Sequence, residues 1–143
     1  MPDATDSGRE QEIRVVGAGA LRHGESIPFT FVAAGETFEG FVLRYDEGPV
    51  DTLVAYRNWC PHVGTDLDMG SRRFYSRNVG RIYCHTHGAQ FQVITGECDF
   101  GPCVGLHLER YAVRAVGADA LVTVPAGDSA ATHDPENPPE PAD

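Results

Sequence analysis

Residues 60–62 are Cys60-Pro61-His62, and residues 84–87 are Cys84-His85-Thr86-His87. Each motif combines a thiol with an imidazole, and both side-chain types bind transition metals. Each motif is also short enough to lie within one tight loop. Two such loops facing each other would present two sulfur and two nitrogen ligands to one site. The sequence therefore predicts a metal centre held by Cys60, His62, Cys84 and His87.

Two kinds of metal centre accept this ligand set. In a Rieske-type [2Fe–2S] cluster, two cysteines hold one iron and two histidines hold the other. A structural zinc site usually takes its cysteines and its histidines from separate C-x₂₋₄-C and H-x₃₋₅-H units. Here each motif mixes both ligand types, which favours the cluster, with Cys60 and Cys84 on one iron and His62 and His87 on the other. A zinc-stabilised binding module stays as the remote alternative.

The residues around the two motifs resemble the cluster-binding loops of the Rieske ferredoxin family. The matching stretches are Asn58-Trp59-Cys60-Pro61-His62-Val63-Gly64-Thr65-Asp66-Leu67 and Tyr83-Cys84-His85-Thr86-His87-Gly88-Ala89-Gln90-Phe91. Downstream, Thr95-Gly96-Glu97 and Gly101-Pro102-Cys103 are similar to the turn and the proline loop that cover the cluster in that family. The resemblance spans residues 13–125 and implies one [2Fe–2S] cluster per chain, bound by the four ligands named above.

Two departures from respiratory Rieske proteins affect the expected chemistry. Those proteins carry an extra cysteine in each ligand loop and join the loops by a disulfide, whereas this chain has Thr65 and Thr86 there. They also use a Ser and a Tyr as hydrogen-bond donors to the cluster, and the matching residues here are Ala89 and Phe91. Because such bonds favour the more negative, reduced state, we expect a potential near the bottom of the Rieske range of roughly −150 to +300 mV.

The length of 143 residues fits one small domain. Most of the formal charge of −10 lies near the termini, since residues 1–12 contribute −3 and residues 128–143 contribute −5. We expect residues 1–12 to be a flexible segment and residues 126–143 to be a disordered, acidic, proline-rich tail. Residues 13–125 then form the Rieske domain, which is nearly balanced in charge.

The arginines and the apolar stretches bear on partners and location. All eleven basic residues are arginines, and they form no run typical of a nucleic-acid footprint. The concentration at Arg72, Arg73, Arg77 and Arg81 is either a solvated loop or a surface that steers an acidic redox partner.

No apolar stretch is long enough to span a membrane, and the N-terminus does not resemble an export signal. We therefore predict a cytoplasmic protein that binds a reductase and a terminal acceptor, and no small-molecule substrate.

Short alternating apolar runs, separated by Gly and Pro, predict an all-β fold. The expected strands are residues 13–16, 29–32, 38–45, 53–56, 81–84, 89–94, 111–116 and 120–124. Their number favours an antiparallel β-sandwich or barrel, and the family resemblance implies a small cluster-binding subdomain at one end. We expect residues 66–78 to form a short helix or an irregular excursion. The alternation in residues 38–45 predicts that one face of this strand is buried.

Three further features carry an expectation, and two of them also have an alternative. Trp59 is expected to be a buried aromatic, with shielding of the cluster or a place on the electron path as the alternative. His85 does not fit the ligand spacing of the family and is expected to be an exposed loop residue. Cys98 and Cys103 are expected to be two thiols in a reducing cytoplasm, with a short disulfide as the alternative.

The predicted function is that of a one-electron carrier, similar to ferredoxins that pass electrons from a flavin reductase to a terminal oxygenase. Such a carrier needs no catalytic residues. The alternative is the small Rieske subunit of a multicomponent oxidoreductase such as a nitrite reductase. A self-sufficient oxygenase is disfavoured, because it needs a second domain with a mononuclear iron held by two histidines and a carboxylate.

Overall fold

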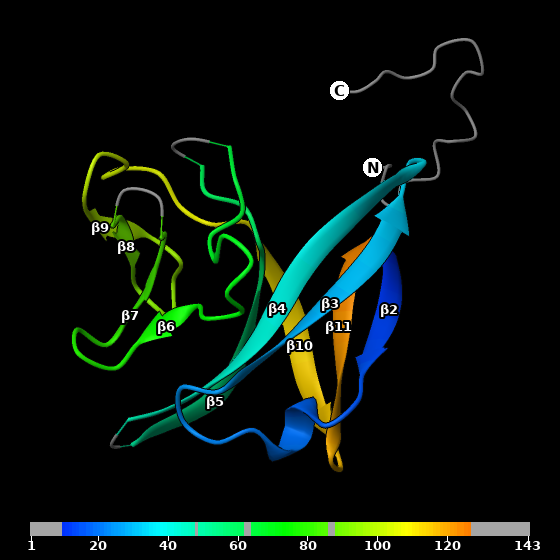
Figure 1. The fold of residues 1–143 in the computed structure, drawn as a ribbon. Coiled ribbons are helices and arrows are strands. Elements are labelled where there is room, and N and C mark those ends of the chain that lie inside the picture. Colours follow the sequence, from blue (N-terminus) through cyan, green and yellow to red (C-terminus); the bar gives the residue numbers. More distant parts are fainter. Residues whose placement is uncertain (1–9, 48, 62–63, 86–87, 127–143) are drawn as a thin grey trace, which may run out of the picture.

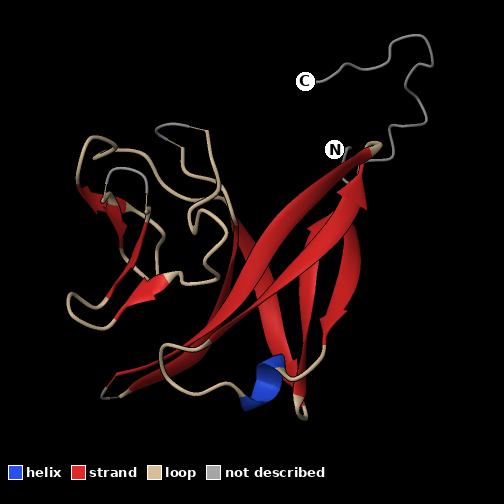
Figure 2. Cartoon of the chain, viewed as in Figure 1, coloured by secondary structure: helices blue, strands red, loops and turns tan. Residues whose placement is uncertain are grey.

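The computed structural model describes residues 10–47, 49–61, 64–85 and 88–126 (Figure 1). Nearly all the regular structure in these residues is β-strand, as Figure 2 shows, with one short 3₁₀ helix, η2 (Ala18–Ala20). The strands are β2 (Glu10–Val15), β3 (Ser26–Ala33), β4 (Glu36–Glu47), β5 (Val50–Arg57), β6 (Tyr75–Ser76), β7 (Arg81–Tyr83), β8 (Gln90–Phe91), β9 (Cys98–Phe100), β10 (Arg110–Val116) and β11 (Asp119–Pro125). The all-β prediction is confirmed.

The strands form two antiparallel sheets. The larger sheet has six strands in the order β2-β11-β10-β5-β4-β3. It curls until its two edges meet, and the side-chain amide of Gln11 on β2 donates to the carbonyl of Val32 on β3 at 2.8 Å. The smaller sheet has four strands in the order β6-β7-β8-β9 and lies beside the large one (Figure 1). The fold is thus a nearly closed barrel with a small subdomain, as the sequence predicts.

The β4–β5 hairpin forms a wall between two cores. Phe41 pairs with Tyr56 and Leu43 pairs with Val54, and all four side chains belong to the core shared with the subdomain. The side chains between them, including Val42, lie in the barrel core. Successive side chains of a strand point to opposite faces, so both faces of this hairpin are buried. The expectation of a single buried face is therefore wrong.

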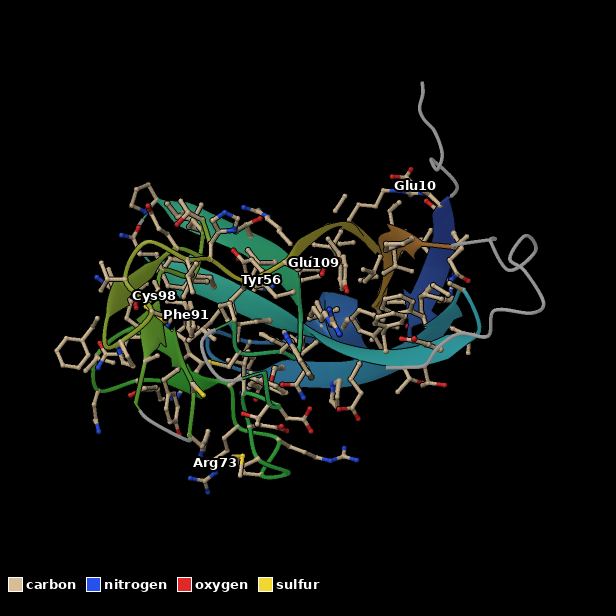
Figure 3. The ribbon with its side chains drawn as sticks, turned by 90° about the horizontal axis from the view of Figure 1, so that it is seen from above. Glu10, Tyr56, Arg73, Phe91, Cys98 and Glu109 are labelled. Atoms are coloured by element: carbon tan, nitrogen blue, oxygen red, sulfur yellow. A yellow bond between two sulfur atoms is a disulfide. The ribbon has the colours of Figure 1, made fainter. Side chains whose placement is uncertain are left out.

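Two contacts fasten the subdomain to this wall. Phe74 of the subdomain stacks on Phe41 of β4, with ring centroids 4.0 Å apart and an interplanar angle of 10°. The Tyr56 hydroxyl of β5 donates to the carbonyl of Val93 at 2.6 Å, and Tyr56 lies between the two parts in Figure 3. Burial raises the pKa of Tyr56 to about 12, so this hydroxyl keeps its proton at neutral pH.

Several element boundaries differ from the predicted ones. Strand β2 begins at Glu10, so residues 10–12 lie in the sheet rather than in a flexible segment. Residues 66–74 are irregular, which confirms the irregular excursion rather than the short helix, and β6 follows. Strands β6 and β9 have two and three residues, which is too few for an alternation to be read, whereas the equally short β7 and β8 fall within the predicted runs 81–84 and 89–94. The rest of the two predicted terminal segments, residues 1–9 and 127–143, lies outside the described residues.

Candidate metal centre

The two predicted cysteine ligands lie in loops that follow strands. Cys60 comes three residues after the end of β5, and Cys84 directly follows β7. Both side chains are 1% exposed, and they belong to the same buried cluster. His62 and His87 lie outside the described residues, so their assignment as ligands stays a prediction. Among the residues that are described, no three His, Cys, Asp or Glu side chains gather into a metal site.

The two cysteine loops, residues 60–65 and 84–89, have the same backbone hydrogen bonds. In each loop the cysteine N–H donates to the carbonyl five residues later, and the glycine N–H four residues later donates to the cysteine carbonyl. The four N···O distances are 2.8–2.9 Å. Gly64 and Gly88 have φ angles of 71° and 74°, in the left-handed region that glycine adopts without a steric penalty. The two cysteines are thus presented by equivalent loops.

The same loop occurs twice more in the subdomain, at residues 76–81 and 92–97. The N–H of Gly80 donates to the Ser76 carbonyl at 2.8 Å, and the N–H of Gly96 donates to the Gln92 carbonyl at 2.7 Å. Each of the four loops has six residues with glycine in the fifth position. The spacing of these glycines is a signal in the sequence for all four turns, of which the prediction names only the one at Thr95-Gly96-Glu97.

A backbone hydrogen bond ties the second cysteine loop to the segment that follows the first. The N–H of His85 donates to the carbonyl of Leu67 at 2.9 Å. The His85 ring stacks on Tyr83, with centroids 4.4 Å apart, and its Nε2 atom lies 2.8 Å from the carbonyl oxygen of Arg73. His85 is partly buried, so the expectation of an exposed loop residue is wrong. It holds the segment that follows the first loop beside the second loop.

A buried polar network connects the residues that precede and follow the first cysteine loop. Asn58 and Asp68 are 5% and 6% exposed. The Asn58 amide accepts a hydrogen bond from the Leu67 N–H at 2.8 Å and donates to Asp68 at 3.1 Å. The Asp68 carboxylate also accepts from the N–H groups of Gly70 and Arg72, at 3.3 and 3.0 Å. A buried carboxylate is costly unless it is hydrogen-bonded, so this network fixes residues 67–72 in one arrangement.

Trp59 is not a core residue, although the sequence predicts one. Its side chain is 40% exposed, and the Arg57 guanidinium lies 4.8 Å from its ring centroid. On the other side it covers the first cysteine loop, because a Cβ atom on Gly64 would lie 3.2 Å from the indole ring. Trp59 therefore shields one side of that loop from solvent.

The proline loop lies against the second cysteine loop. Gly101 has a φ of 105°, and a Cβ atom on it would lie 2.9 Å from the Cα of Ala89. Cys98 and Cys103 form a disulfide across this loop. The default expectation of two thiols is therefore wrong: the Cα atoms are 6.0 Å apart, within the range that a disulfide spans. Figure 3 places Cys98 next to Phe91 of β8.

Comparisons with known proteins agree with this architecture. No protein of curated function matches the sequence. A chain of the complex of reduced oxygenase and oxidised ferredoxin in carbazole 1,9a-dioxygenase is 20% identical with a TM-score of 0.52, and the match covers 78% of this chain and 91% of that chain. A chain described as an NADH-dependent nitrite reductase small subunit from Mycobacterium tuberculosis is 17% identical with a TM-score of 0.56, covering 81% and 96%. At these identities the likeness shows the fold alone.

A family model adds evidence that does not depend on these structures. The model of the Rieske [2Fe-2S] domain matches residues 11–125, which include the barrel, both cysteine loops and the proline loop. Proteins of this kind are electron carriers or components of redox systems. The match covers most of the sequence, and the two loops that distinguish the family are present, so the chain belongs to the Rieske [2Fe–2S] domain family.

Proposed function

We propose that this protein is a soluble one-electron carrier with a Rieske [2Fe–2S] cluster of low potential. Cys60 and Cys84 would hold one iron, and His62 and His87 the other. When bound, the cluster supplies a centre that takes up and releases one electron. The observation that carries the proposal is the pair of equivalent loops, which present two buried thiols from one core.

The described residues fit such a group. Metal-binding cysteines act as thiolates, and a backbone that is fixed before binding reduces the cost of ordering the ligands. Here the loop hydrogen bonds, the His85–Leu67 bond and the Asn58 network fix both cysteine positions. Trp59 on one side and the proline loop on the other limit the access of water. The chain's own contribution is therefore to position the ligands and to cover them.

The direct test is electron paramagnetic resonance of the purified protein, oxidised and dithionite-reduced, with iron, sulfide and zinc quantified on the same sample. A reduced signal of the histidine-ligated type, with two irons and two sulfides per chain, is expected. A silent sample with stoichiometric zinc, after anaerobic preparation has excluded cluster loss, would support the zinc-stabilised module instead.

A carrier that feeds an oxygenase is preferred to a fixed subunit of a larger enzyme. The names of the two structural neighbours, an oxygenase–ferredoxin complex and a nitrite reductase small subunit, suggest both roles. The two roles differ in how the protein is held. A carrier purifies alone and exchanges electrons with separate reductase and acceptor proteins, whereas a subunit co-purifies with a large catalytic chain at a fixed ratio. Affinity purification from the native host distinguishes them.

The low potential follows from the side chains at two positions after the second loop. Ala89 and Phe91 are 1% and 0% exposed, and neither side chain has a hydroxyl to donate. We expect Phe91→Tyr to raise the reduction potential by about 20–60 mV, the one-electron equivalent of a hydrogen bond worth about 0.5–1.5 kcal/mol. Redox titration measures the shift. Phe100→Tyr adds the same hydroxyl at a 58% exposed position and should leave the potential unchanged. An unchanged or lowered potential in Phe91→Tyr contradicts the assignment.

Arg72 and Arg73 are proposed to steer an acidic partner. Both are exposed, and Figure 3 shows Arg73 at the outer rim of the subdomain. Arg81 is paired with Asp99 at 2.9 Å, and Arg77 donates to a backbone carbonyl, so these two are less available. No ion pair involving Arg72 or Arg73 is present within the described part of the chain.

The backbone at Arg72 supports a functional role. Its φ is 65°, a conformation that is strained for a residue other than glycine and that persists where surrounding bonds impose it. Here the bond from the Arg72 N–H to the buried Asp68 carboxylate imposes it. The carbonyl oxygen of Arg73 lies 2.8 Å from the His85 Nε2 atom, so the backbone that carries the two arginines is held beside the second cysteine loop.

We expect the double variant Arg72→Gln/Arg73→Gln to slow oxidation of the reduced protein by the anion ferricyanide roughly 2- to 10-fold at low ionic strength, because complementary charge raises encounter rates. Stopped-flow measurement of the rate against salt concentration checks this. The matched control is Arg14→Gln/Arg114→Gln, which removes the same charge from the barrel, where these arginines pair with Asp119 and Glu12. Equal slowing in both pairs would show that only the net charge matters.

The proposed location is the cytoplasm. No helix among the described residues is long and apolar enough to cross a bilayer. The Cys98–Cys103 disulfide bears on this proposal, because disulfides are rare in the reducing cytoplasm of mesophiles. Cell fractionation combined with acid quenching and thiol alkylation determines both the compartment and the state of these cysteines. Recovery of the protein outside the cytoplasm would overturn the proposed location.

A further inference from the structure

We infer that the Cys98–Cys103 disulfide clamps the proline loop, defined as residues 98–106, against the second cysteine loop and thereby prolongs retention of the cluster. The inference rests on the proposed function for its ligand, but the clamp itself is a property of the described residues. It assigns these two cysteines a positioning role beyond the four predicted ligands.

The disulfide joins a fixed strand to a loop. Cys98 lies on β9 and pairs with Phe91 of β8, so one end of the cross-link is part of the small sheet. Cys103 follows the turn of the proline loop, and its carbonyl accepts a hydrogen bond from the Leu106 N–H at 2.8 Å. Both cysteine side chains are buried, at 2% and 1% exposure, in the same core cluster as Cys60 and Cys84. The cross-link therefore fixes the loop from its inner side.

The clamped loop touches the loop that carries Cys84. A Cβ atom on Gly101 would lie 2.9 Å from the Cα of Ala89, so the two backbones are in close contact there. The Ala89 carbonyl in turn accepts the hydrogen bond from the Cys84 N–H at 2.8 Å. A displacement of the proline loop would thus remove the support of the backbone that positions Cys84 and open the site to water.

Side-chain packing contributes little to holding the tip of the proline loop in place. Its large apolar side chains point to solvent, since Phe100, Val104 and Leu106 are 58%, 65% and 45% exposed. Their exposure means that hydrophobic burial of these residues does not fasten the loop. The Arg81–Asp99 ion pair is at the surface, where such pairs contribute little. The bond from the Cys98 N–H to the Leu106 carbonyl, at 2.9 Å, closes the base of the loop, and the disulfide constrains it nearer the tip.

The clamp acts locally rather than on the stability of the whole chain. A cross-link between residues five apart closes a small ring, and small rings remove little entropy from the unfolded chain. A dithiol such as dithiothreitol would give two electrons and two protons to the two sulfurs, breaking the S–S bond, and would itself be oxidised to its cyclic disulfide. Reduction should therefore loosen the cover while the barrel stays folded.

The test compares cluster loss in the wild-type protein, in Cys98→Ser/Cys103→Ser, and in Val104→Ser, a control that alters the same loop at an exposed position. Visible absorbance and the electron paramagnetic resonance signal follow the loss in the presence of an iron chelator. We expect the double variant to lose its cluster about 10-fold faster or more, the typical effect of removing outer support from a metal site. Val104→Ser should match the wild type, and wild-type protein reduced with dithiothreitol and alkylated should match the double variant.

Amide hydrogen exchange at Cys84 and Gly88 in the purified proteins provides a readout that does not require a cluster. The double variant should exchange faster at these two positions, with a nearly unchanged urea midpoint. Equal exchange and equal cluster loss would overturn the clamp, as would alkylation of both cysteines in the native protein without a reductant. If the wild type binds no cluster but the exchange difference is present, the proposed function fails and the clamp survives.

Discussion

Cys84→Ser is expected to abolish the cluster, with iron and sulfide falling from about two of each per chain to near zero. The Cys84 side chain is buried in the core that it shares with Cys60, and its loop is closed by two backbone hydrogen bonds. Serine keeps the shape of the side chain but has no thiolate, the form in which cysteine binds metals. Metal and sulfide analysis, together with the spectrum of the reduced protein, measures the loss.

His85→Asn is the matched control for this prediction. His85 is adjacent to Cys84, but its ring nitrogen lies 2.8 Å from the Arg73 carbonyl oxygen, so it is engaged in holding the neighbouring segment. We expect this variant to keep its two irons and its spectrum. A cluster retained in a folded Cys84→Ser protein would show that the ligand assignment is wrong, whereas loss in a folded His85→Asn protein would show that the contact of the His85 ring with Arg73 is needed to hold the site. Circular dichroism of both variants confirms that each is folded.

Phe74→Ala is expected to lower the free energy of unfolding by about 3–5 kcal/mol, the usual cost of truncating a buried aromatic. Phe74 is 1% exposed and stacks on Phe41 of the barrel wall, with ring centroids 4.0 Å apart. The Phe74 carbonyl also accepts a hydrogen bond, at 3.0 Å, from the N–H of Tyr83, the residue directly before Cys84. The cavity left by removing the Phe74 ring would therefore loosen the second cysteine loop as well.

Urea unfolding followed by Trp59 fluorescence measures this effect. Phe100→Ala makes the same chemical change at a side chain that is 58% exposed, and surface changes of this kind usually alter stability by less than about 0.5 kcal/mol. The difference in the free energy of unfolding between the two variants measures the contribution of burial, because both variants lose the same ring. Similar losses in both, or no loss in Phe74→Ala, would contradict the role given to the stack.

The parts of the fold that could be predicted are those whose signal lies within a short stretch of sequence. The two motifs around Cys60 and Cys84 indicate paired ligand loops because their residue types and spacing lie within a few positions. Strands β3, β4, β5, β10 and β11 could be predicted because each is long enough to show alternation or an apolar run. The family model confirms the domain that these signals predict.

The parts that could not be predicted depend on contacts between distant residues. Both faces of the β4–β5 hairpin are buried because a second core covers the face that the barrel does not. The sequence of residues 41–56 does not indicate which parts of the chain pack on each face. The partial burial of His85 results from Arg73 and Tyr83, and the disulfide depends on how the proline loop folds back onto β9. The exposure of Trp59 likewise reflects its place over Gly64 at the surface.

The shared wall of the β4–β5 hairpin also bears on how this protein would deliver an electron. Because the same two strands line both cores, the subdomain cannot pivot on the barrel without opening one of them. The subdomain that carries Cys60 and Cys84 is therefore expected to move together with the barrel. An electron would be carried by diffusion of the entire molecule, and turnover with a separate acceptor should depend on protein concentration and solvent viscosity rather than on an internal motion.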